Sequence, residues 1–566
     1  MRLSFFLLLL LSTTLFAQGE YPKDYFRSPL DIPLRLSGNF GELRPNHFHA
    51  GFDMKTLQKE GLNVYAVADG YVSRIKISTF GNGKTIYIDH PNGFTSVYGH
   101  LQKAADSIET YIKKTHYQEQ SFEIEMYFKP NQMPVKKGQL IALSGNTGAS
   151  EGPHLHFEFR DTKSEKIINP IFFGFDALIK DGKKPIVSNL YAYPLEAKTV
   201  VNHSQRRIPI NISLQKDGTY LADKVVANDK IGFGITTYDY DDLSFNKNGV
   251  FNVDLSCNGK PVFGYQFNTY SFDEMRYVNA LIDYAFYKKT GQRIQKLFMD
   301  PPYNLSIIKT DLSNGIISVT PNLTNVCQLE VSDFFGNKTT IAIPIEYDAL
   351  SAVIEKEAVA SNYIVKASKD CFFEKDKNSV FFPAGTFYND FNLNFDFKNN
   401  VLTVHDDTVP AHTNFTITME SSSYDASKKD KVFIGRISGN GLSYNSTREK
   451  NNVYEIRTKT LGQYKLAIDT VAPVIKISKS IEGKNLSHQK VLQVRISDGI
   501  SGVKSYNGYL NGKWILMEYD NKTGLLTYDF NDGIASEGDN ELKIVVVDNV
   551  GNSATFETHF QRNQKL

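Results

Sequence analysis

Two segments of the chain alternate apolar and polar residues with the period of a β-strand. In HLHFEF, residues 154–159, the leucine and phenylalanines fall on one face and the histidines and glutamate on the other. The segment HFHAGFDM, residues 47–54, has the same layout and puts His49, Gly51 and Asp53 on one face. Because Gly51 has no side chain, we expect the space between His49 and Asp53 to stay open. The pattern predicts two strands, each with an apolar back and a polar face.

A helical pattern appears in a long segment, residues 102–134. Apolar residues recur there at helical spacing and predict an amphipathic helix of about four turns. The stretch SFEIEMYF, residues 121–128, then alternates with period two and predicts a strand. Because this segment leaves the sheet next to His100, we expect it to form one wall of a cleft. The helical positions are Ala104, Ala105, Ile108, Tyr111 and Ile112.

The rest of the chain indicates further β-rich modules. Residues 331–340 (VSDFFGNKTT) and 546–555 (VVDNVGNSAT) share the pattern D-x-x-G-N-x-x-T, which predicts a final hairpin in each of two related segments. We predict immunoglobulin-like β-sandwiches at 185–346 and 471–566, with a β-rich module of uncertain type at 347–470 between them. No low-complexity linker separates these units, so we expect them to be packed or closely strung.

Length and composition agree with several β-rich domains. The 566 residues correspond to about three to four domains. The chain has 39 Phe and 31 Tyr, residues that favour strands. A net charge of +1 gives no sign of a nucleic-acid partner.

The N-terminal sequence is typical of an exported protein. Residues 1–17, MRLSFFLLLLLSTTLFA, place one Arg before a short apolar run and predict a signal peptide cleaved after Ala17. We therefore expect a protein of the periplasm, cell envelope or extracellular space, without a transmembrane anchor after cleavage. The three cysteines, Cys257, Cys327 and Cys371, are odd in number and form no disulfide framework. One pair could bridge, but we favour small buried residues.

The polar faces of the two strands carry candidate metal ligands. Catalytic zinc sites typically use three protein ligands, with His nitrogens and carboxylate oxygens about 2.0–2.2 Å from the metal. His49, Asp53 and either His154 or His156 would supply such a set. His100 is a weaker candidate, and Glu158 either supports a ligand or is an exposed strand carboxylate, which we favour. We interpret His90 as structural.

The order of these motifs resembles the lysostaphin/LytM-type zinc metallopeptidases. The resemblance rests on HAGFD, VYAVADGYV, GNGKTIYIDHPNGFTSVYGHL and VKKGQLIALSGNTGASEGPHLHFEF, and it covers about residues 35–175. It implies an antiparallel β-sheet metallopeptidase domain of the duplicated hybrid motif type at 18–184, with the helical segment as an insertion. The whole chain is then mainly β. The resemblance also implies one Zn²⁺ per chain, held by His49, Asp53 and His156, with His100 and His154 as catalytic histidines.

The resemblance implies a peptidoglycan endopeptidase that cuts peptide cross-links with metal-activated water. The chain has no H-E-x-x-H motif, so no glutamate base of that class is expected, and the proton transfers fall to the two histidines. The alternative is a non-catalytic module that binds peptidoglycan or regulates another hydrolase. All five family positions stand in this sequence, which favours the enzyme. We expect the C-terminal β-modules to serve positioning or protein partners.

Overall fold

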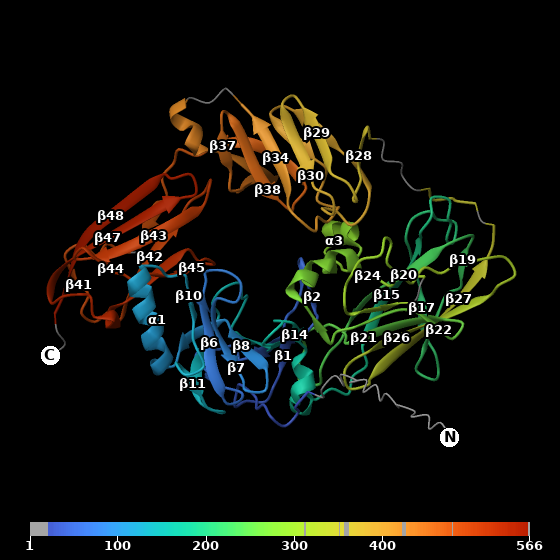
Figure 1. Ribbon diagram of the computed structural model, residues 1–566, viewed down its shortest axis with the longest axis horizontal. Coiled ribbons are helices and arrows are strands. Elements are labelled where there is room, and N and C mark those ends of the chain that lie inside the picture. The colour runs from blue at the N-terminus through green and yellow to red at the C-terminus, as the bar shows by residue number, and fades with distance from the viewer. Residues whose placement is uncertain are drawn as a thin grey trace, which may run out of the picture.

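The protein is mainly β, with 46% of residues in strands and 9% in helices. The computed structural model describes residues 21–310, 313–349, 351–355, 361–421, 426–477 and 479–563 (Figure 1). The expected signal peptide lies outside the described residues. No helix in the described ranges combines the length and the apolar character needed to cross a membrane.

The N-terminal domain is built on a ten-stranded sheet whose neighbouring strands all pair antiparallel. The predicted alternation of β13 is visible in its packing, because Phe157 and Phe159 lie in an aromatic core with Phe173 and Phe175. The main path runs β1 (Leu36–Gly38), β4 (Phe52–Lys55), β13 (His154–Asp161), β8 (Phe94–Gly99), β7 (Lys84–Asp89), β6 (Gly70–Ile77) and β10 (Ile124–Tyr127), with β11 (Pro134–Val135), β14 (Ile167–Ile168) and β23 (Thr269–Tyr270) beside it.

A second, three-stranded sheet packs on the first. It consists of β5 (Asn63–Tyr65), β12 (Leu140–Ser144) and β9 (Leu101–Ala104). The chain passes from β8 of the large sheet to β9 of the small one through His100, whose φ of 57° is left-handed. Such a conformation is uncommon for a residue with a Cβ and often marks a functional position. The short pair β2 (Leu43–Arg44) and β3 (His47–Phe48) precedes β4.

The insertion contains the predicted helix and strand. Helix α1 (Asp106–Glu119) buries Ile108 and Ile112, and β10 then pairs with β6 at the sheet edge. The helix begins after Ala105, because Ala104 still belongs to β9. Tyr111 is 48% exposed, so the apolar stripe is narrower than the sequence pattern suggested.

The following module, strands β15 to β27, is joined closely to the N-terminal domain. β23 pairs with β14 and so belongs to the large sheet, across the predicted boundary at residue 184. One buried apolar cluster runs through both parts. The module has two sheets. The first has the order β16 (Ile208–Ile210), β15 (Ile186–Pro194), β20 (Ile231–Tyr238), β24 (Gln295–Lys296). The second has the order β17 (Ile212–Leu214), β18 (Tyr220–Ala222), β27 (Lys338–Tyr347), β26 (Asn325–Ser332), β21 (Asn252–Cys257), β22 (Lys260–Gln266), β25 (Ile308–Thr310), and β19 (Val225–Ala227) also pairs with β27.

Short helices and two further β-modules complete the chain. The helices are η1 (Pro170–Phe173), η2 (Phe175–Leu178), η3 (Phe272–Tyr277), α2 (Val278–Leu281), α3 (Tyr284–Thr290), η4 (Ala426–Lys431) and η5 (Phe530–Asp532). The third module contains the pair β28 (Tyr363–Val365) and β31 (Phe391–Leu393) and two five-stranded sheets. One sheet has the order β29 (Cys371–Lys375), β30 (Asn378–Phe382), β34 (Phe415–Glu420), β38 (Val453–Thr458), β37 (Arg448–Lys450). The other has the order β32 (Phe395–Lys398), β33 (Val401–Val404), β39 (Gly462–Ile468), β35 (Val432–Ser438), β36 (Gly441–Tyr444).

The C-terminal module has two sheets. One has the order β40 (Val474–Lys476), β42 (Val491–Ser497), β46 (Leu525–Asp529), β45 (Glu518–Asp520). The other has the order β41 (Lys484–Asn485), β48 (Ser553–Arg562), β47 (Gly538–Asp548), β43 (Val503–Leu510), β44 (Lys513–Ile515). Both predicted final hairpins are confirmed, since β26 pairs with β27 and β47 with β48 around the D-x-x-G-N turns. The immunoglobulin-like type of the two sandwiches stays a prediction.

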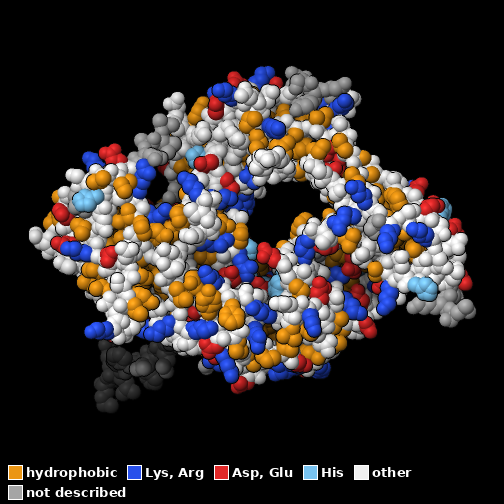
Figure 2. All heavy atoms as spheres, turned by 180° about the vertical axis from the view of Figure 1, so that it is seen from behind, with side chains coloured by type: hydrophobic (Ala, Val, Ile, Leu, Met, Phe, Trp, Pro, Cys, Tyr) orange, Lys and Arg blue, Asp and Glu red, His pale blue; other side chains and the backbone are white. Residues whose placement is uncertain are grey.

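The modules close into a ring around a central opening, which Figure 2 shows from behind. The C-terminal module returns to the N-terminal domain and contacts α1: Asp532 accepts a hydrogen bond from Tyr117 at 2.5 Å and pairs with Lys113 at 2.7 Å. Nearby, Lys84 pairs with the carboxylate of Glu518 at 2.8 Å. Neighbouring modules also contact each other, Arg276 with the carbonyl oxygen of Ala411 and Lys431 with that of Val550, so the expectation of packed or closely strung units is confirmed.

The preference for unpaired cysteines is wrong for two of the three. Cys257 on β21 and Cys327 on β26 are directly opposite each other in register and form a disulfide. They lie 70 residues apart in the sequence, so only the strand pairing brings them together. Cys371 is free.

Candidate metal centre

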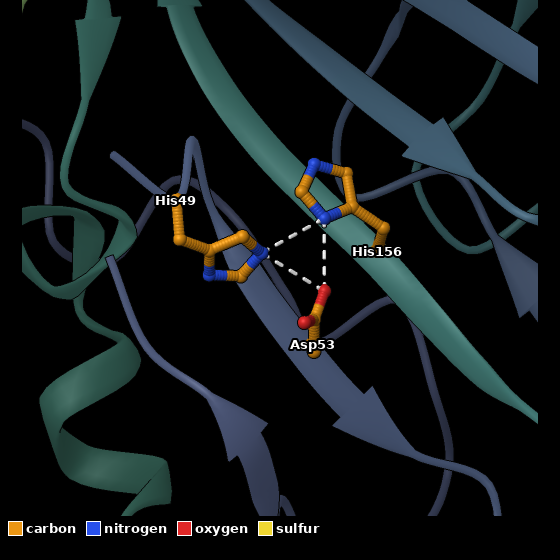
Figure 3. A group of neighbouring side chains, drawn as sticks. All are labelled: His49, Asp53 and His156. Atoms are coloured by element: carbon orange, nitrogen blue, oxygen red, sulfur yellow. Dashed lines mark hydrogen bonds and ion pairs between the residues drawn. The ribbon is translucent and has the colours of Figure 1, made fainter. Parts of the chain in front are cut away.

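Three side chains converge on one point at the centre of the N-terminal sheet, as Figure 3 shows. His49 Nε2 lies 3.0 Å from Asp53 Oδ1 and 3.2 Å from His156 Nδ1, and His156 Nδ1 lies 2.9 Å from Asp53 Oδ1. All three residues are buried, with exposed fractions of 4–7%. Two imidazole nitrogens and a carboxylate oxygen thus face one another away from bulk water.

The strand register produces this convergence. His156 on β13 is directly opposite Asp53 on β4 and Gly99 on β8. Gly51 is required for a different reason from the one expected, because a Cβ there would lie 2.1 Å from the carbonyl oxygen of Phe157. His49 is not on a strand as predicted but lies in the connection between β3 and β4.

A second set of contacts fixes which ring nitrogen of each histidine faces the centre. His49 Nδ1 is 2.7 Å from the carbonyl oxygen of Asn39, so Nδ1 donates a proton and Nε2 keeps its lone pair. His156 Nε2 is 2.8 Å from Glu158 Oε1, so Nε2 donates and Nδ1 faces the centre. When both rings are neutral, their lone pairs therefore point where a cation would sit.

Glu158 is not the exposed strand carboxylate that we favoured. It is 2% exposed, and its other oxygen accepts a hydrogen bond from Arg160 Nε at 2.8 Å. The polar face of β13 is covered at this point, because the guanidinium of Arg160 lies over the ring of Phe272, 4.6 Å from its centroid. Glu158 therefore orients His156, and Arg160 in turn holds Glu158.

Two further histidines lie beside the three converging residues. His154 Nε2 is 3.3 Å from Asp53 Oδ1, and its Nδ1 is 2.8 Å from the carbonyl oxygen of Gly152. His100 Nδ1 is 2.8 Å from the carbonyl oxygen of Thr147, and the ring centroids of His100 and His154 are 4.7 Å apart. Each ring thus donates from Nδ1 to the backbone, and Nε2 of His154 faces Asp53.

The electrostatics of the site favour a cation. Burial alone would raise the pKa of Asp53, but the charge of His49 and hydrogen bonds from the surrounding histidines hold that pKa well below its usual range. Burial and the positive charges of His156 and His154 lower the pKa of His100 to about 3, so its ring is neutral near pH 7. Burial opposes the charged form of His156, but Asp53 and Glu158 raise its pKa to about 9 in the metal-free protein.

The donor set fits zinc. Ligand atoms bound to a tetrahedral zinc at about 2.0–2.1 Å lie roughly 3.3 Å from one another. The three observed separations, 2.9, 3.0 and 3.2 Å, are close to that value. Two neutral imidazoles with one carboxylate, each oriented by a further hydrogen bond, are typical ligands of catalytic zinc.

The site opens into a cleft of about 1130 Å³. None of the residues that line it comes from the insertion, so the expectation that residues 102–134 form a wall is wrong. The opposite wall comes from the second module instead, through Leu243, Phe245, Phe272 and Met275. Phe245 is 97% exposed and presents an apolar surface toward the cleft.

Several residues of the site were not identified from the sequence. Arg44 donates to Asp53 Oδ2 at 3.1 Å, and Tyr270 of the second module donates to the carbonyl oxygen of His49 at 2.5 Å. Arg44 lies nine residues from Asp53 and could have been considered as a charge partner. Tyr270 lies 221 residues from His49, and no local pattern points to it. His90 Nδ1 lies 2.9 Å from the carbonyl oxygen of Asp69 and Nε2 lies 2.8 Å from Ser96 Oγ, contacts that agree with our interpretation of His90 as structural.

Comparison with known proteins identifies two parts of the chain. Residues 47–117 and 122–170 match the model of peptidase family M23, and residues 362–469 match that of the Zu5-like domain. An uncharacterized metalloprotease of Haemophilus influenzae is 34% identical over 164 residues, which are 27% of this chain and 28% of that protein. The peptidoglycan DD-endopeptidase ShyC of Vibrio cholerae is 33% identical over 143 residues, 24% of this chain and 27% of its own.

Among solved structures, the catalytic domain of lysostaphin from Staphylococcus simulans is 24% identical, with a TM-score of 0.18 over 24% of this chain and 86% of that one. The chain thus spans little more than a quarter of the length of the curated relatives. The match to peptidase family M23 falls on the N-terminal domain that carries the five residues described above. This domain, over residues 47–170, belongs to peptidase family M23, the lysostaphin/LytM-type metallopeptidases.

Proposed function

We propose that the protein is an exported zinc-dependent endopeptidase that hydrolyses peptide cross-links of cell-wall peptidoglycan. The observation that carries this proposal is the convergence of His49 Nε2, Asp53 Oδ1 and His156 Nδ1 in a cleft, with two further histidines beside them. His49, Asp53 and His156 would hold the zinc. When bound there, zinc would lower the pKa of a water ligand to about 7 and polarise the scissile carbonyl.

The remaining residues of the site are suited to moving protons. His100 is neutral near pH 7, and its Nδ1–H is engaged by Thr147, so its Nε2 is available to accept a proton. His154 Nδ1 is engaged by Gly152, which leaves its Nε2 to donate to, or accept from, the reacting oxygen. One of the two acts as general base and the other stabilises the oxyanion.

The substrate assignment rests on the relatives and on the form of the cleft. Several curated relatives carry the name peptidoglycan DD-endopeptidase or DD-carboxypeptidase/endopeptidase. The cleft is open and apolar on the side of Phe245 and Met275, and basic and acidic residues such as Arg35 and Glu151 lie elsewhere along it. Such a cleft suits a peptide that carries both apolar and charged groups.

Replacing the proposed catalytic histidines separates chemistry from metal binding. We expect His100→Ala and His154→Ala to retain one zinc per chain but to lose about 10²–10⁴-fold in turnover of purified cross-linked peptides, the usual contribution of a general acid or base. Zinc is measured by elemental analysis and cleavage by mass spectrometry of the products. Wild-type turnover in either variant would remove that histidine from the mechanism, and turnover unaffected in both would support a different active site.

A further inference from the structure

A second cluster of carboxylates lies where the N-terminal domain meets the second module. Asp181 follows η2 in the connection to β15, Asp239 follows the last residue of β20, and Asp333 begins the turn between β26 and β27. One carboxylate oxygen from each lies within 4.8 Å of the others. A fourth carboxylate, Asp241, lines the same cavity of about 60 Å³.

These carboxylates are not neutralised by ion pairs. In the described part of the chain, no Lys or Arg nitrogen lies within 4.0 Å of any of the four carboxylates. Lys183 donates instead to the backbone oxygen of Asp241, at 2.8 Å. Several negative charges thus meet in a poorly hydrated place, which costs free energy unless a cation or protons compensate them.

Two buried oxygen atoms of residues that line this cavity have no hydrogen-bond partner, and one of them, Asn248 Oδ1, does not belong to the acidic cluster. Oδ2 of Asp241 and Oδ1 of Asn248 are both unpartnered, in side chains that are 5% and 6% exposed. Most buried polar atoms in folded proteins are hydrogen-bonded, so two orphaned acceptors in the wall of one cavity point to a missing positive partner. Both residues line the cavity together with Asp181, Asp239 and Asp333.

We propose that this cavity binds one Ca²⁺, held by Asp181, Asp239, Asp241 and Asp333 with the amide oxygen of Asn248. Every donor is an oxygen, and no nitrogen or sulfur ligand lines the cavity beside them, which favours a hard cation. Calcium accepts six to eight oxygens at about 2.3–2.6 Å in flexible geometry, whereas magnesium requires a stricter octahedron. The ion would fasten the connection at Asp181, the end of β20 and the hairpin turn to one another.

The sequence layout of this site recurs once in the C-terminal module. Asp469 stands four residues before a proline, as Asp181 does. Asp498 follows the end of β42, as Asp239 follows the end of β20. Asp548 begins the second D-x-x-G-N turn, as Asp333 begins the first. Asn337 donates to both Asp333 and the carbonyl of Asp181, and Asn552 donates in the same way to Asp548 and Asp469.

The recurring cluster differs in the atoms that matter most for a cation. Position 500, equivalent to Asp241, is Ile500, so the fourth carboxylate is missing. Asp498 Oδ1 already accepts hydrogen bonds from the amides of Ile500, Ser501 and Gly502. Backbone amides donate to the first cluster too, but two buried oxygens stay unpartnered there. In the described part of the chain the C-terminal triad has no buried carboxylate oxygen without a partner, so we assign the ion to the first cluster only.

The site also touches the segment that positions a proposed zinc ligand. Asn39 lines the cavity, its amide bonds to the backbone of Gly249 in both directions at 2.7 and 2.8 Å, and its carbonyl oxygen accepts from His49. The cation would therefore stabilise the junction on which the metal centre rests. The proposal itself does not depend on peptidase activity.

Calcium binding by the full-length, zinc-loaded protein tests the proposal. Equilibrium dialysis with radioactive calcium at millimolar concentration should find one ion bound per wild-type chain. The double variant Asp239→Asn/Asp241→Asn should bind none. Both asparagines keep Oδ1, which accepts from the backbone amides of Tyr240 and Leu243, so the fold is preserved. Asp254→Asn, at an exposed position of the same module, is the matched control and should keep the ion.

Thermal unfolding supplies a second reading that does not need tight binding. Without calcium, the double variant should melt at the same temperature as the wild type or higher, because it has lost repulsion between carboxylates. With millimolar calcium the wild-type midpoint should rise, and that of the variant should not. No calcium bound to the wild type, or equal binding and equal calcium response in wild type and double variant, would overturn the proposal. A response to magnesium but not calcium would overturn the choice of ion.

Discussion

Glu158→Gln tests how far zinc affinity depends on the residues behind the ligands. In the wild type, the Glu158 carboxylate accepts from His156 Nε2 at 2.8 Å and pairs with Arg160 at 2.6 Å. Burial opposes its ionisation, but Arg160 and His156 lower the pKa of Glu158 to about 2. Relative to the ordinary value of 4.5, that shift corresponds to about 3 kcal/mol in favour of the carboxylate.

The glutamine variant keeps the shape but removes this charge. Its amide oxygen can still accept from His156, but its NH₂ group then faces the donors of Arg160, whose guanidinium remains buried. Breaking one partner of a buried pair typically costs about 3–5 kcal/mol of unfolding free energy. Loss of a partner that orients a metal ligand typically weakens metal affinity by about 10–100-fold. We expect both effects in Glu158→Gln.

A matched double variant separates the two effects. Glu158→Gln/Arg160→Met also removes the unpaired guanidinium, so it should recover much of the unfolding free energy measured in denaturant. Its zinc affinity, measured by competition with a chromophoric chelator, should stay reduced because His156 still lacks its carboxylate. Zinc affinity within twofold of wild type in the stable double variant would refute the role assigned to Glu158.

Three further predictions concern the scaffold. A fragment of residues 18–185 should unfold at a lower denaturant concentration than one of residues 18–346, because it lacks β23 and the hydrogen bond from Tyr270 to His49. Equal midpoints would show that residues 18–185 fold independently of the second module. Burial lowers the pKa of His90, so its neutral form stabilises the fold at pH 7, and this stability is lost as the pH falls below about 6.5, the unperturbed pKa. The difference in unfolding free energy between wild type and His90→Gln should therefore shrink from pH 7 to pH 5. A constant difference would contradict this. Asp532→Ala removes the contacts of Asp532 with Tyr117 and Lys113 of α1 and should open the ring, which small-angle scattering would detect as a larger radius of gyration. The exposed control Asp539→Ala should leave the radius unchanged. An unchanged radius in Asp532→Ala would show that other contacts are sufficient to close the ring.

Local patterns in the sequence were sufficient for the strands of the N-terminal domain, the helix of the insertion and the two D-x-x-G-N hairpins. Together with the family resemblance that the motifs carry, they selected five residues that the structure brings together around one cleft. Period-two alternation and short motif spacing determine these features, because each depends on residues close in the chain. The zinc ligation and the catalytic roles of those residues stay predictions.

Features that depend on distant residues were missed for a physical reason. Alternation places Glu158 on a polar face but does not reveal that Phe272 and Arg160 cover that face. The disulfide depends on the pairing of β21 with β26, and the apolar wall of the cleft depends on the second module folding over the first. Ring closure likewise depends on contacts between α1 and the C-terminal module, which are hundreds of residues apart.

The central claim is tested most directly by digesting purified peptidoglycan sacculi of defined cross-link chemistry with the zinc-loaded protein. Wild type, metal-depleted wild type and the ligand variants His49→Ala and Asp53→Ala are compared, with zinc content measured in parallel. The account predicts that wild type releases fragments whose masses show a hydrolysed peptide cross-link, and that both ligand variants lack zinc and release none. Cleavage by a zinc-free variant, full zinc occupancy in either variant, or intact cross-links after digestion with zinc-loaded wild type would contradict it.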